Sequence, residues 1–174
     1  MAILPIRVMG DPVLRQPARL ALEFDDALRR LADDMIDTMH EAPGVGLAAP
    51  QVASSIRLFV YDIGDGPGAI VNPTLSGHEG EQIGEEGCLS IPGLYFPVRR
   101  AMKVVVDGFD PEGSPVRVEG EELLARVFQH ETDHLDGVLF LDRLDDETRR
   151  EAMAALREQE LGLVSVDPDP TRAL

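Results

Sequence analysis

The segment from His130 to His134 reads His-Glu-Thr-Asp-His and holds the side chains best suited to chemistry. In an α-helix, residues four positions apart lie one above the other, so both imidazoles could reach one divalent cation, with Glu131 beside them as an acid or base. A match this short also arises by chance, or with histidines that are surface residues or satisfied core residues. The pattern alone therefore suggests a metal site without establishing one.

The helix face that carries these histidines favours metal binding. Leu123 and Val127 share this face with His130 and His134, so the histidines continue an apolar stripe and should point inward. Unpaired buried imidazoles are costly. Two inward histidines therefore need a partner, and a cation would be one.

Cys88, the only cysteine of the 174 residues, offers a third ligand. It cannot form an internal disulfide, and a lone thiol in a reducing compartment can be a buried filler, a nucleophile or a metal ligand. Gly87 permits a close backbone approach, and Leu89 suggests a strand entering the core. A lone cysteine is usually a small buried hydrophobe. With two inward histidines available, we favour ligation.

Three helices should position these residues. Phe24, Leu28, Leu31, Met35 and Met39 recur at helical spacing and predict an amphipathic helix from Asp25 that ends near Pro43. Helical spacing returns over residues 121–135, around the two histidines. Residues 145–158 predict a third, more exposed helix.

Strands are expected between the first two helices. Apolar and β-branched runs favour strands over residues 56–61, 69–71, 103–109 and 116–118, with a hairpin turn at 110–113. Residues 44–51 carry two glycines and a proline and are expected to be irregular. A helix, then strands, then helices indicate an α+β fold rather than alternating βαβ units.

Composition limits the class of protein. The formal net charge of −16 excludes an overall field that attracts nucleic acid, so we expect no DNA partner. No apolar run approaches the roughly 20 residues that cross a bilayer, and we expect no membrane partner and no signal peptide. We therefore expect a cytoplasmic protein with one catalytic domain, residues 1–160, and a flexible acidic tail, residues 161–174.

Three blocks together resemble the signature motifs of the peptide deformylase family. They are GVGLAAPQ at 44–51, EGCLS at 86–90 and QHETDHLDG at 129–137, and the resemblance extends from Ile6 to about Leu144. It implies a compact α+β fold in which antiparallel β-sheets pack around a central helix bearing the HExxH motif, with flanking N- and C-terminal helices. It also implies that Cys88, His130 and His134 bind one ion per chain, ferrous iron in the cell, which zinc, nickel or cobalt can replace.

The resemblance implies a metal-dependent hydrolase that removes the N-formyl group from the N-terminal methionine of newly synthesised proteins and releases formate. A cation held by three protein ligands leaves a position where water becomes a nucleophile near neutral pH. The resemblance assigns the side-chain amide of Gln51 and the backbone N–H of Leu89 to the oxyanion that develops. Glu131 is expected to carry the proton from water to the leaving amine.

Substrate binding can be predicted only in part. Val45, Leu123 and Val127 are placed to line an apolar slot for methionine, and Gly46 would let the peptide backbone lie close. Tyr95 lies near where some family members carry a basic residue that contacts the peptide. The expected partners are N-formylmethionyl nascent peptides. A transient ribosome contact is left open, because the arginines of residues 145–158 are mixed with acids.

The resemblance also implies that Glu86 supports the fold around the first block by pairing with an arginine, for which Arg100 is a candidate. Without the other blocks, Gln51 would be a strand cap and Gly46 a turn residue.

Two alternatives remain. A zinc peptidase also uses H-E-x-x-H, but it takes its third ligand from downstream, where this sequence has no histidine. A catalytically inactive nascent-chain or ribosome-binding protein would keep the metal only as a structural element, which requires a fourth protein ligand. The presence of Gln51 and Glu131 argues against this second alternative.

Overall fold

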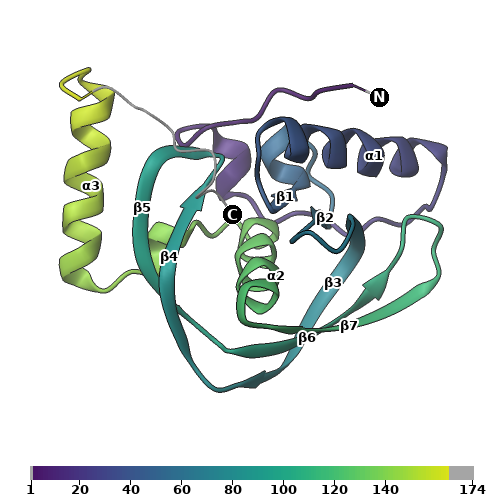
Figure 1. The fold of residues 1–174 in the computed structure, drawn as a ribbon. Coiled ribbons are helices and arrows are strands. Elements are labelled where there is room, and N and C mark those ends of the chain that lie inside the picture. Colours follow the sequence, from purple (N-terminus) through teal and green to yellow (C-terminus); the bar gives the residue numbers. More distant parts are fainter. Residues whose placement is uncertain (1, 165–174) are drawn as a thin grey trace.

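The computed structural model describes residues 2–164, which form an antiparallel β-sheet structure around one central helix (Figure 1). The helices are α1 (Asp26–Glu41), α2 (Glu122–Leu135) and α3 (Asp146–Glu160). The strands are β1 (Gly46–Ala48), β2 (Leu58–Tyr61), β3 (Gly68–Glu79), β4 (Gln82–Cys88), β5 (Ile91–Arg100), β6 (Lys103–Phe109) and β7 (Pro115–Glu121). Short 3₁₀ turns lie at Pro12–Arg15, Ala49–Val52 and Phe140–Arg143.

The strands form two sheets. Five strands pair in the order β1-β2-β3-β6-β7, and β4 pairs with β5 as a separate hairpin. Each pairing between neighbouring strands in these sheets is antiparallel. The register between β3 and β6 shifts twice, between Val71 and Thr74 and again between Ser76 and Glu79. Such shifts bend and twist a strand, and β3 runs along the curved part of the larger sheet.

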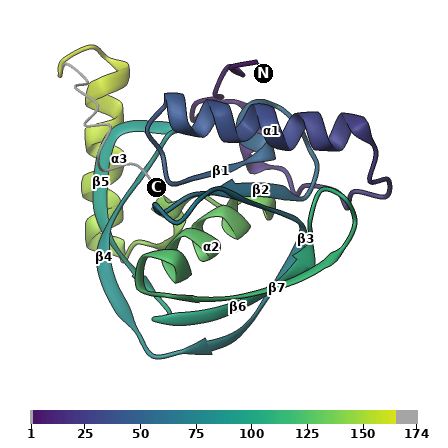
Figure 2. The ribbon, with the colours of Figure 1, turned by 45° about the vertical axis from the view of Figure 1, so that its right-hand side comes forward.

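The larger sheet curls around α2. Helix α1 lies outside β1 and β2, whereas α2 lies on their other side and above β6 and β7 (Figure 2). The β4–β5 hairpin flanks α2 on a further side, and α3 packs against β5 (Figure 1). Because helix α2 is enclosed in this way, ten of its fourteen residues are buried.

The three predicted helices are confirmed, and their ends have local causes. Helix α1 begins after Asp25, whose side chain accepts a hydrogen bond from the N–H of Leu28 at 2.9 Å. Helix α3 begins after Asp145, which accepts from the N–H groups of Glu147 and Thr148. Both acids satisfy amides that lack a partner in the first helical turn.

The predicted strands are confirmed in position, with different lengths. The strand at 103–109 matches β6, whereas the one predicted at 69–71 is the start of the much longer β3. The prediction that residues 44–51 are irregular is wrong. Residues 46–48 form β1, paired with β2 from Gly46–Tyr61 to Ala48–Phe59, and a 3₁₀ turn follows. Pairing and complete burial override the weak strand preference of this glycine-rich segment.

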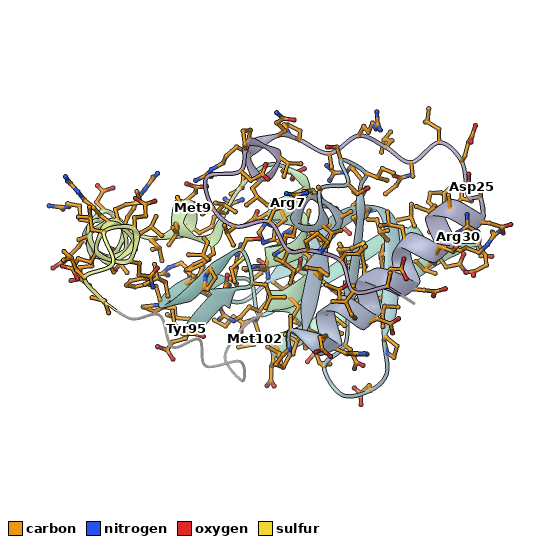
Figure 3. All side chains as sticks on the ribbon, turned by 90° about the horizontal axis from the view of Figure 1, so that it is seen from above. Arg7, Met9, Asp25, Arg30, Tyr95 and Met102 are labelled. Atoms are coloured by element: carbon orange, nitrogen blue, oxygen red, sulfur yellow. The ribbon has the colours of Figure 1, made fainter. Side chains whose placement is uncertain are left out.

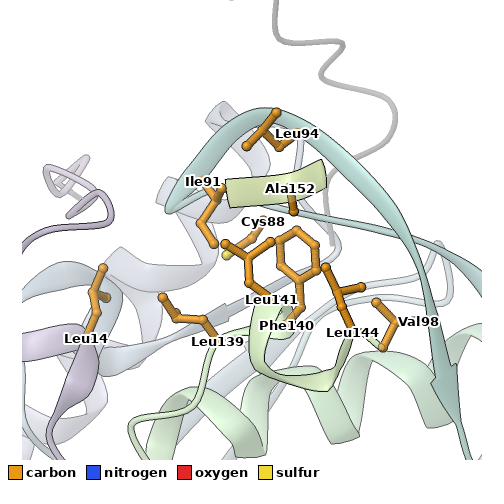
Figure 4. Packing of buried hydrophobic residues seen from close by; sticks show 10 residues of the cluster. All are labelled: Leu14, Cys88, Ile91, Leu94, Val98, Leu139, Phe140, Leu141, Leu144 and Ala152. Carbon is orange, nitrogen blue, oxygen red and sulfur yellow. The ribbon is translucent and has the colours of Figure 1, made fainter. Parts of the chain in front are cut away.

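One apolar cluster supports the hairpin from behind. It packs the end of β4 against β5, the 3₁₀ turn at Phe140–Arg143 and α3 (Figure 4). Its buried members are Leu14, Cys88, Ile91, Leu94, Val98, Leu139, Phe140, Leu141, Leu144 and Ala152. Cys88 is therefore held by the core of the protein rather than by a surface loop.

Among residues 2–164, no helix is both long enough and apolar enough to cross a lipid bilayer. The tail expected at 161–174 lies, from residue 165 onward, outside the described residues.

Candidate metal centre and active site

Cys88, His130 and His134 meet inside the protein. Cys88 is the last residue of β4, after a register shift that follows Glu86, and both histidines face it from α2. One ligand atom from each residue lies within 4.8 Å of the others, and Sγ of Cys88 is 3.3 Å from Nε2 of His134. All three residues are at most 3% exposed. A thiolate and two imidazoles are a donor set that suits zinc or iron.

Glu86 orients the first histidine. Its Oε2 lies 3.0 Å from Nδ1 of His130, and Glu86 is fully buried. A carboxylate accepts the hydrogen of Nδ1 and leaves the lone pair of Nε2 directed away from it, toward a metal. Burial alone would raise the pKa of Glu86, but hydrogen bonds from Arg100 and His130 hold it well below its usual range. Glu86 is therefore an anion that can orient the ring.

The pairing of Glu86 with Arg100 is confirmed. Nε and Nη2 of Arg100 donate to the two carboxylate oxygens at 2.8 and 2.9 Å. Its Nη1 donates to Asp133 at 2.7 Å. The carboxylate of Glu86 contacts His130 and arginines, so the described contacts connect it to the metal ligands rather than to residues 44–51.

Glu131 lies beside the ligands with its carboxylate enclosed. The residue is 1% exposed, and burial raises its pKa to about 7. Gly46 provides the space for it, since a Cβ at position 46 would lie 2.4 Å from Oε1 of Glu131. Gly46 therefore admits the carboxylate of Glu131 to this position.

The unpaired polar atoms fit a bound cation. Among the described residues, the buried side-chain atoms without a hydrogen-bond partner include Nε2 of His130 and both carboxylate oxygens of Glu131. Burial also lowers the pKa of His134 well below its usual value, so this ring is neutral and able to bind a metal. Buried polar atoms without partners are costly. Their concentration around Cys88 is what a metal and its water would satisfy.

Gln51 reaches the same place from the 3₁₀ turn after β1. Its Oε1 accepts from the N–H of Ala48 at 2.8 Å, which directs its amide nitrogen toward Sγ of Cys88, 3.7 Å away, and Oγ of Ser90, 3.2 Å away. Leu89 follows Cys88 in the turn between β4 and β5. The Gln51 amide and the residues after Cys88 thus lie on one side of the ligand cluster.

The N-terminal segment braces this side of the site. The N–H of Arg7 donates to the carbonyl of Gln51 at 2.7 Å, and the N–H of Met9 donates to the carbonyl of Ser90 at 2.8 Å. Figure 3 shows Arg7 and Met9 on the strand-like segment that passes over the body of the protein. Two site residues from distant parts of the chain are thereby tied to one segment.

The residues predicted to line a methionine slot have different environments. Val127 is fully buried and Val45 is half-buried. Leu123 is 44% exposed, so the helix face that it shares with the histidines is open to solvent at this end. It lies in the first turn of α2, beyond the part of the helix that the sheets enclose. Tyr95 lies on β5, on the side of the molecule near α3 (Figure 3).

Sequence reasoning missed three buried polar residues next to the site: Ser90, Arg126 and Asp133. Ser90 accepts from the Gln51 amide, while Arg126 and Asp133 bond to Glu86 and Arg100 respectively. Arg126 could have been noticed in the sequence. It is a cation within the apolar run Leu123-Leu124-Ala125-Arg126-Val127-Phe128 of a helix expected to be buried.

Comparison with known proteins decides the family. The family model described as polypeptide deformylase matches residues 3–150. The chain belongs to the polypeptide deformylase family. It is 56% identical to a peptide deformylase of Acidothermus cellulolyticus, over 99% of this chain and 98% of the relative.

Solved peptide deformylases share the fold. The enzyme from Thermus thermophilus superposes with a TM-score of 0.87 at 47% identity, covering 92% of this chain and 96% of that one. The Synechococcus elongatus peptide deformylase, solved in complex with actinonin, gives 0.84 at 42% identity over 90% and 87% of the two chains. The antiparallel sheets and flanking helices are therefore those of a deformylase.

Family membership gives the activity. This deformylase is a hydrolase that removes the N-formyl group from newly synthesised proteins, and its group of one cysteine and two histidines implies a metal. The prediction made from the three sequence blocks is confirmed at this level.

Proposed function

We propose that Cys88, His130 and His134 hold one divalent cation and that this centre carries the deformylase activity. The observation that supports this most is the meeting of their ligand atoms within 4.8 Å, beside a buried carboxylate without a hydrogen-bond partner. When bound, the cation supplies a Lewis acid and a water activated near neutral pH. A purely structural site would use a fourth protein ligand.

Glu131 is the proton carrier in this proposal. Its carboxylate lies beside the ligands, and its pKa near 7 lets it accept a proton from water and return it to the leaving amine. Gly46 maintains that position by leaving room for Oε1. Cleavage of the formyl C–N bond then yields formate and a free N-terminal amine.

Gln51 and Leu89 stabilise the charge on the formyl oxygen. The amide nitrogen of Gln51 is directed toward the ligand cluster by the bond from Ala48 to Oε1, so the donor is oriented before substrate arrives. The backbone N–H of Leu89 is the second donor. Donors fixed in a buried site stabilise a developing oxyanion without a cost of reorganisation.

The substrate is an N-formylmethionyl nascent peptide. Val45 and Val127 provide apolar surface for the methionine side chain, and Leu123 would close the outer end of the same slot, where its exposed surface can contact substrate. Residues 1–160 act as the single catalytic domain, in the cytoplasm and without a membrane or DNA partner. A transient ribosome contact would place the enzyme near its substrate.

The ion in the cell is ferrous iron. A thiolate with two imidazoles accepts ferrous iron, and zinc, nickel or cobalt suit the same donors. Since zinc binds more tightly than ferrous iron to a given set of ligands, protein isolated in air would carry zinc.

The decisive experiment compares two hydrolyses. Metal-loaded protein is incubated with a formyl-methionyl peptide and, separately, with an N-acetylated peptide of the same sequence, and formate and internal cleavage products are measured. We expect formate release that chelation abolishes and metal restores, with no internal cleavage. Chelator-resistant formate release, or peptide-bond cleavage, would contradict the proposal.

A further inference from the structure

Arg126 is an arginine buried in the wall of the metal centre. It lies one helical turn before His130 on α2 and is 5% exposed. Its Nη1 donates to the carbonyl oxygens of Gly84 on β4 and Val98 on β5, each at 3.1 Å, and its Nη2 donates to Oε1 of Gln82 at 3.2 Å. The guanidinium of Arg126 thus bonds to both β4, which ends at Cys88, and β5.

The same guanidinium contacts the carboxylate that orients His130. Oε1 of Glu86 accepts from Nη1 of Arg126 at 2.9 Å and from Nε of Arg100 at 2.8 Å. Oε2 accepts from Nη2 of Arg100 and contacts Nδ1 of His130. Two arginine donors therefore bond to Oε1, while Oε2 is shared between Arg100 and the histidine.

Three arginines meet two buried carboxylates in this cluster. Arg100 is shared between the two carboxylates, Glu86 and Asp133. Arg143 also pairs with Asp133, but its side chain is 49% exposed. Arg126 is the additional cation bonded directly to Glu86, and a buried charge without enough partners is strongly destabilising.

We propose that Arg126 is a positioning residue of the metal centre. It fixes Glu86 so that Oε2 orients His130, and it fixes the β4–β5 hairpin so that Cys88 meets the histidines of α2. This inference rests on the proposed metal centre. A guanidinium suits the role because its planar group bonds several acceptors at once, which the ammonium of lysine does not do in a fixed geometry.

Gly84 leaves room for this arrangement. A Cβ at position 84 would lie 3.0 Å from Nη2 and 3.4 Å from Cζ of Arg126. Alanine at this position would therefore displace the guanidinium while leaving its charge in the protein. This provides a way to disturb Arg126 without removing it.

The test measures cobalt binding by the metal-free protein, from the absorption of the thiolate–cobalt bond and from the rate of transfer to a chelator. Arg126→Met is expected to weaken Co²⁺ affinity about 10-fold, the lower end of the effect of losing a direct partner of a metal ligand, because Arg126 acts through Glu86. Arg126→Lys and Gly84→Ala should give smaller losses. Arg117→Met is the matched control, because Arg117 pairs with Asp107 on the exposed hairpin of β6 and β7, and it should bind as wild type.

A double-mutant cycle with Glu86→Gln separates positioning from general destabilisation. If Arg126 acts through Glu86, Arg126→Met should weaken Co²⁺ binding much less in the Glu86→Gln background than in wild type. Full additivity, or wild-type affinity in Arg126→Met, would overturn the inference. If Arg126→Met fails to fold, the same double-mutant cycle with Glu86→Gln can be measured with Gly84→Ala or Arg126→Lys.

Cobalt spectra distinguish the metal centre itself from the positioning role of Arg126. Wild-type protein that binds Co²⁺ without a thiolate absorption band would contradict the metal centre itself. A normal band in wild type, unchanged in the Arg126 and Gly84 variants, would contradict only the positioning role.

Discussion

The carboxylate of Glu131 lies directly against the backbone of Gly46. An added Cβ at position 46 would be 2.4 Å from Oε1, 2.9 Å from Cδ and 3.0 Å from Cγ of Glu131, and the first two distances are shorter than real Cβ contacts. Strand β1 and helix α2 thus approach each other closely at Glu131, the proposed proton carrier. The carboxylate of Glu131 fits there because Gly46 has no side chain.

Gly46→Ala should therefore displace Glu131 or push β1 away from α2. Because both residues are buried, we expect a loss of about 1–3 kcal/mol in the free energy of unfolding and a larger relative loss in kcat than in KM. Urea denaturation and formate release would measure the two effects. Glu131→Ala should restore stability to the Gly46→Ala protein by removing the clashing atoms. Equal destabilisation in both backgrounds would contradict this contact.

Glu131→Gln should retain the metal and lose most hydrolysis. The amide has the shape of the carboxylate but accepts no proton at neutral pH, so a fall in kcat of about 10²–10⁴-fold is expected. Metal content and formate release measured on the same sample would separate binding from catalysis. Turnover at the wild-type rate would remove Glu131 from the mechanism.

Asp142→Asn should change how stability depends on pH. Burial alone would raise the pKa of Asp142, but the Arg15 guanidinium and the N–H of Leu139 hold it below its usual value. The folded protein therefore binds this proton less readily than the unfolded chain, and the stabilisation exists above the unfolded pKa of about 4 and is lost as pH falls through the folded pKa.

We expect Asp142→Asn to cost about 0.5–1 kcal/mol at pH 7, because solvent partly screens this ion pair, and progressively less below about pH 4. Urea denaturation of the metal-free proteins at several pH values would measure this. Asp33→Asn, on the exposed face of α1, is the control. A difference from wild type that stays constant down to low pH would show that Asp142 acts by packing rather than by charge.

Iron-loaded enzyme should be the more active form and should decay in air. Oxygen can oxidise ferrous iron and the Cys88 thiolate, whereas zinc has no redox chemistry. We expect anaerobic iron-loaded protein to exceed the zinc form markedly in formate release and to lose activity on aeration, while nickel- or cobalt-loaded protein persists. Equal activity of iron and zinc forms, with no loss in air, would show that iron is not specially required.

The helices and the three motif blocks could be predicted because their signals are local. The periodicity from Leu28 to Met39 and the capping Asp25 specify α1 without reference to the rest of the chain. The ligand set was found in the same way, from the spacing of His130 and His134 and from a single cysteine beside a glycine.

The hairpin of β4 and β5 could not be predicted as an element, because its stability comes from partners far along the chain. The β4 sequence Gln-Ile-Gly-Glu-Glu-Gly-Cys lacks the alternation of apolar and polar residues that is typical of a strand. From sequence alone Glu86 resembles a surface acid, because its partners Arg100 and Arg126 are distant along the chain. Strand β1 is similar, since its pairing with β2 decides its conformation. The exposure of Leu123 likewise depends on where the enclosing sheets end.

The enclosure of α2 has a consequence for the kinetics of metal exchange. Cys88 belongs to the hairpin and the histidines to the helix, and none of the three side chains is more than 3% exposed. All three ligands are in place only while the hairpin is docked on α2, and its separation from α2 is a local unfolding event. We expect exchange to follow the opening rate of the hairpin rather than the affinity of the site. Replacement of iron by zinc during isolation would then be slower in any variant whose hairpin is more stably docked.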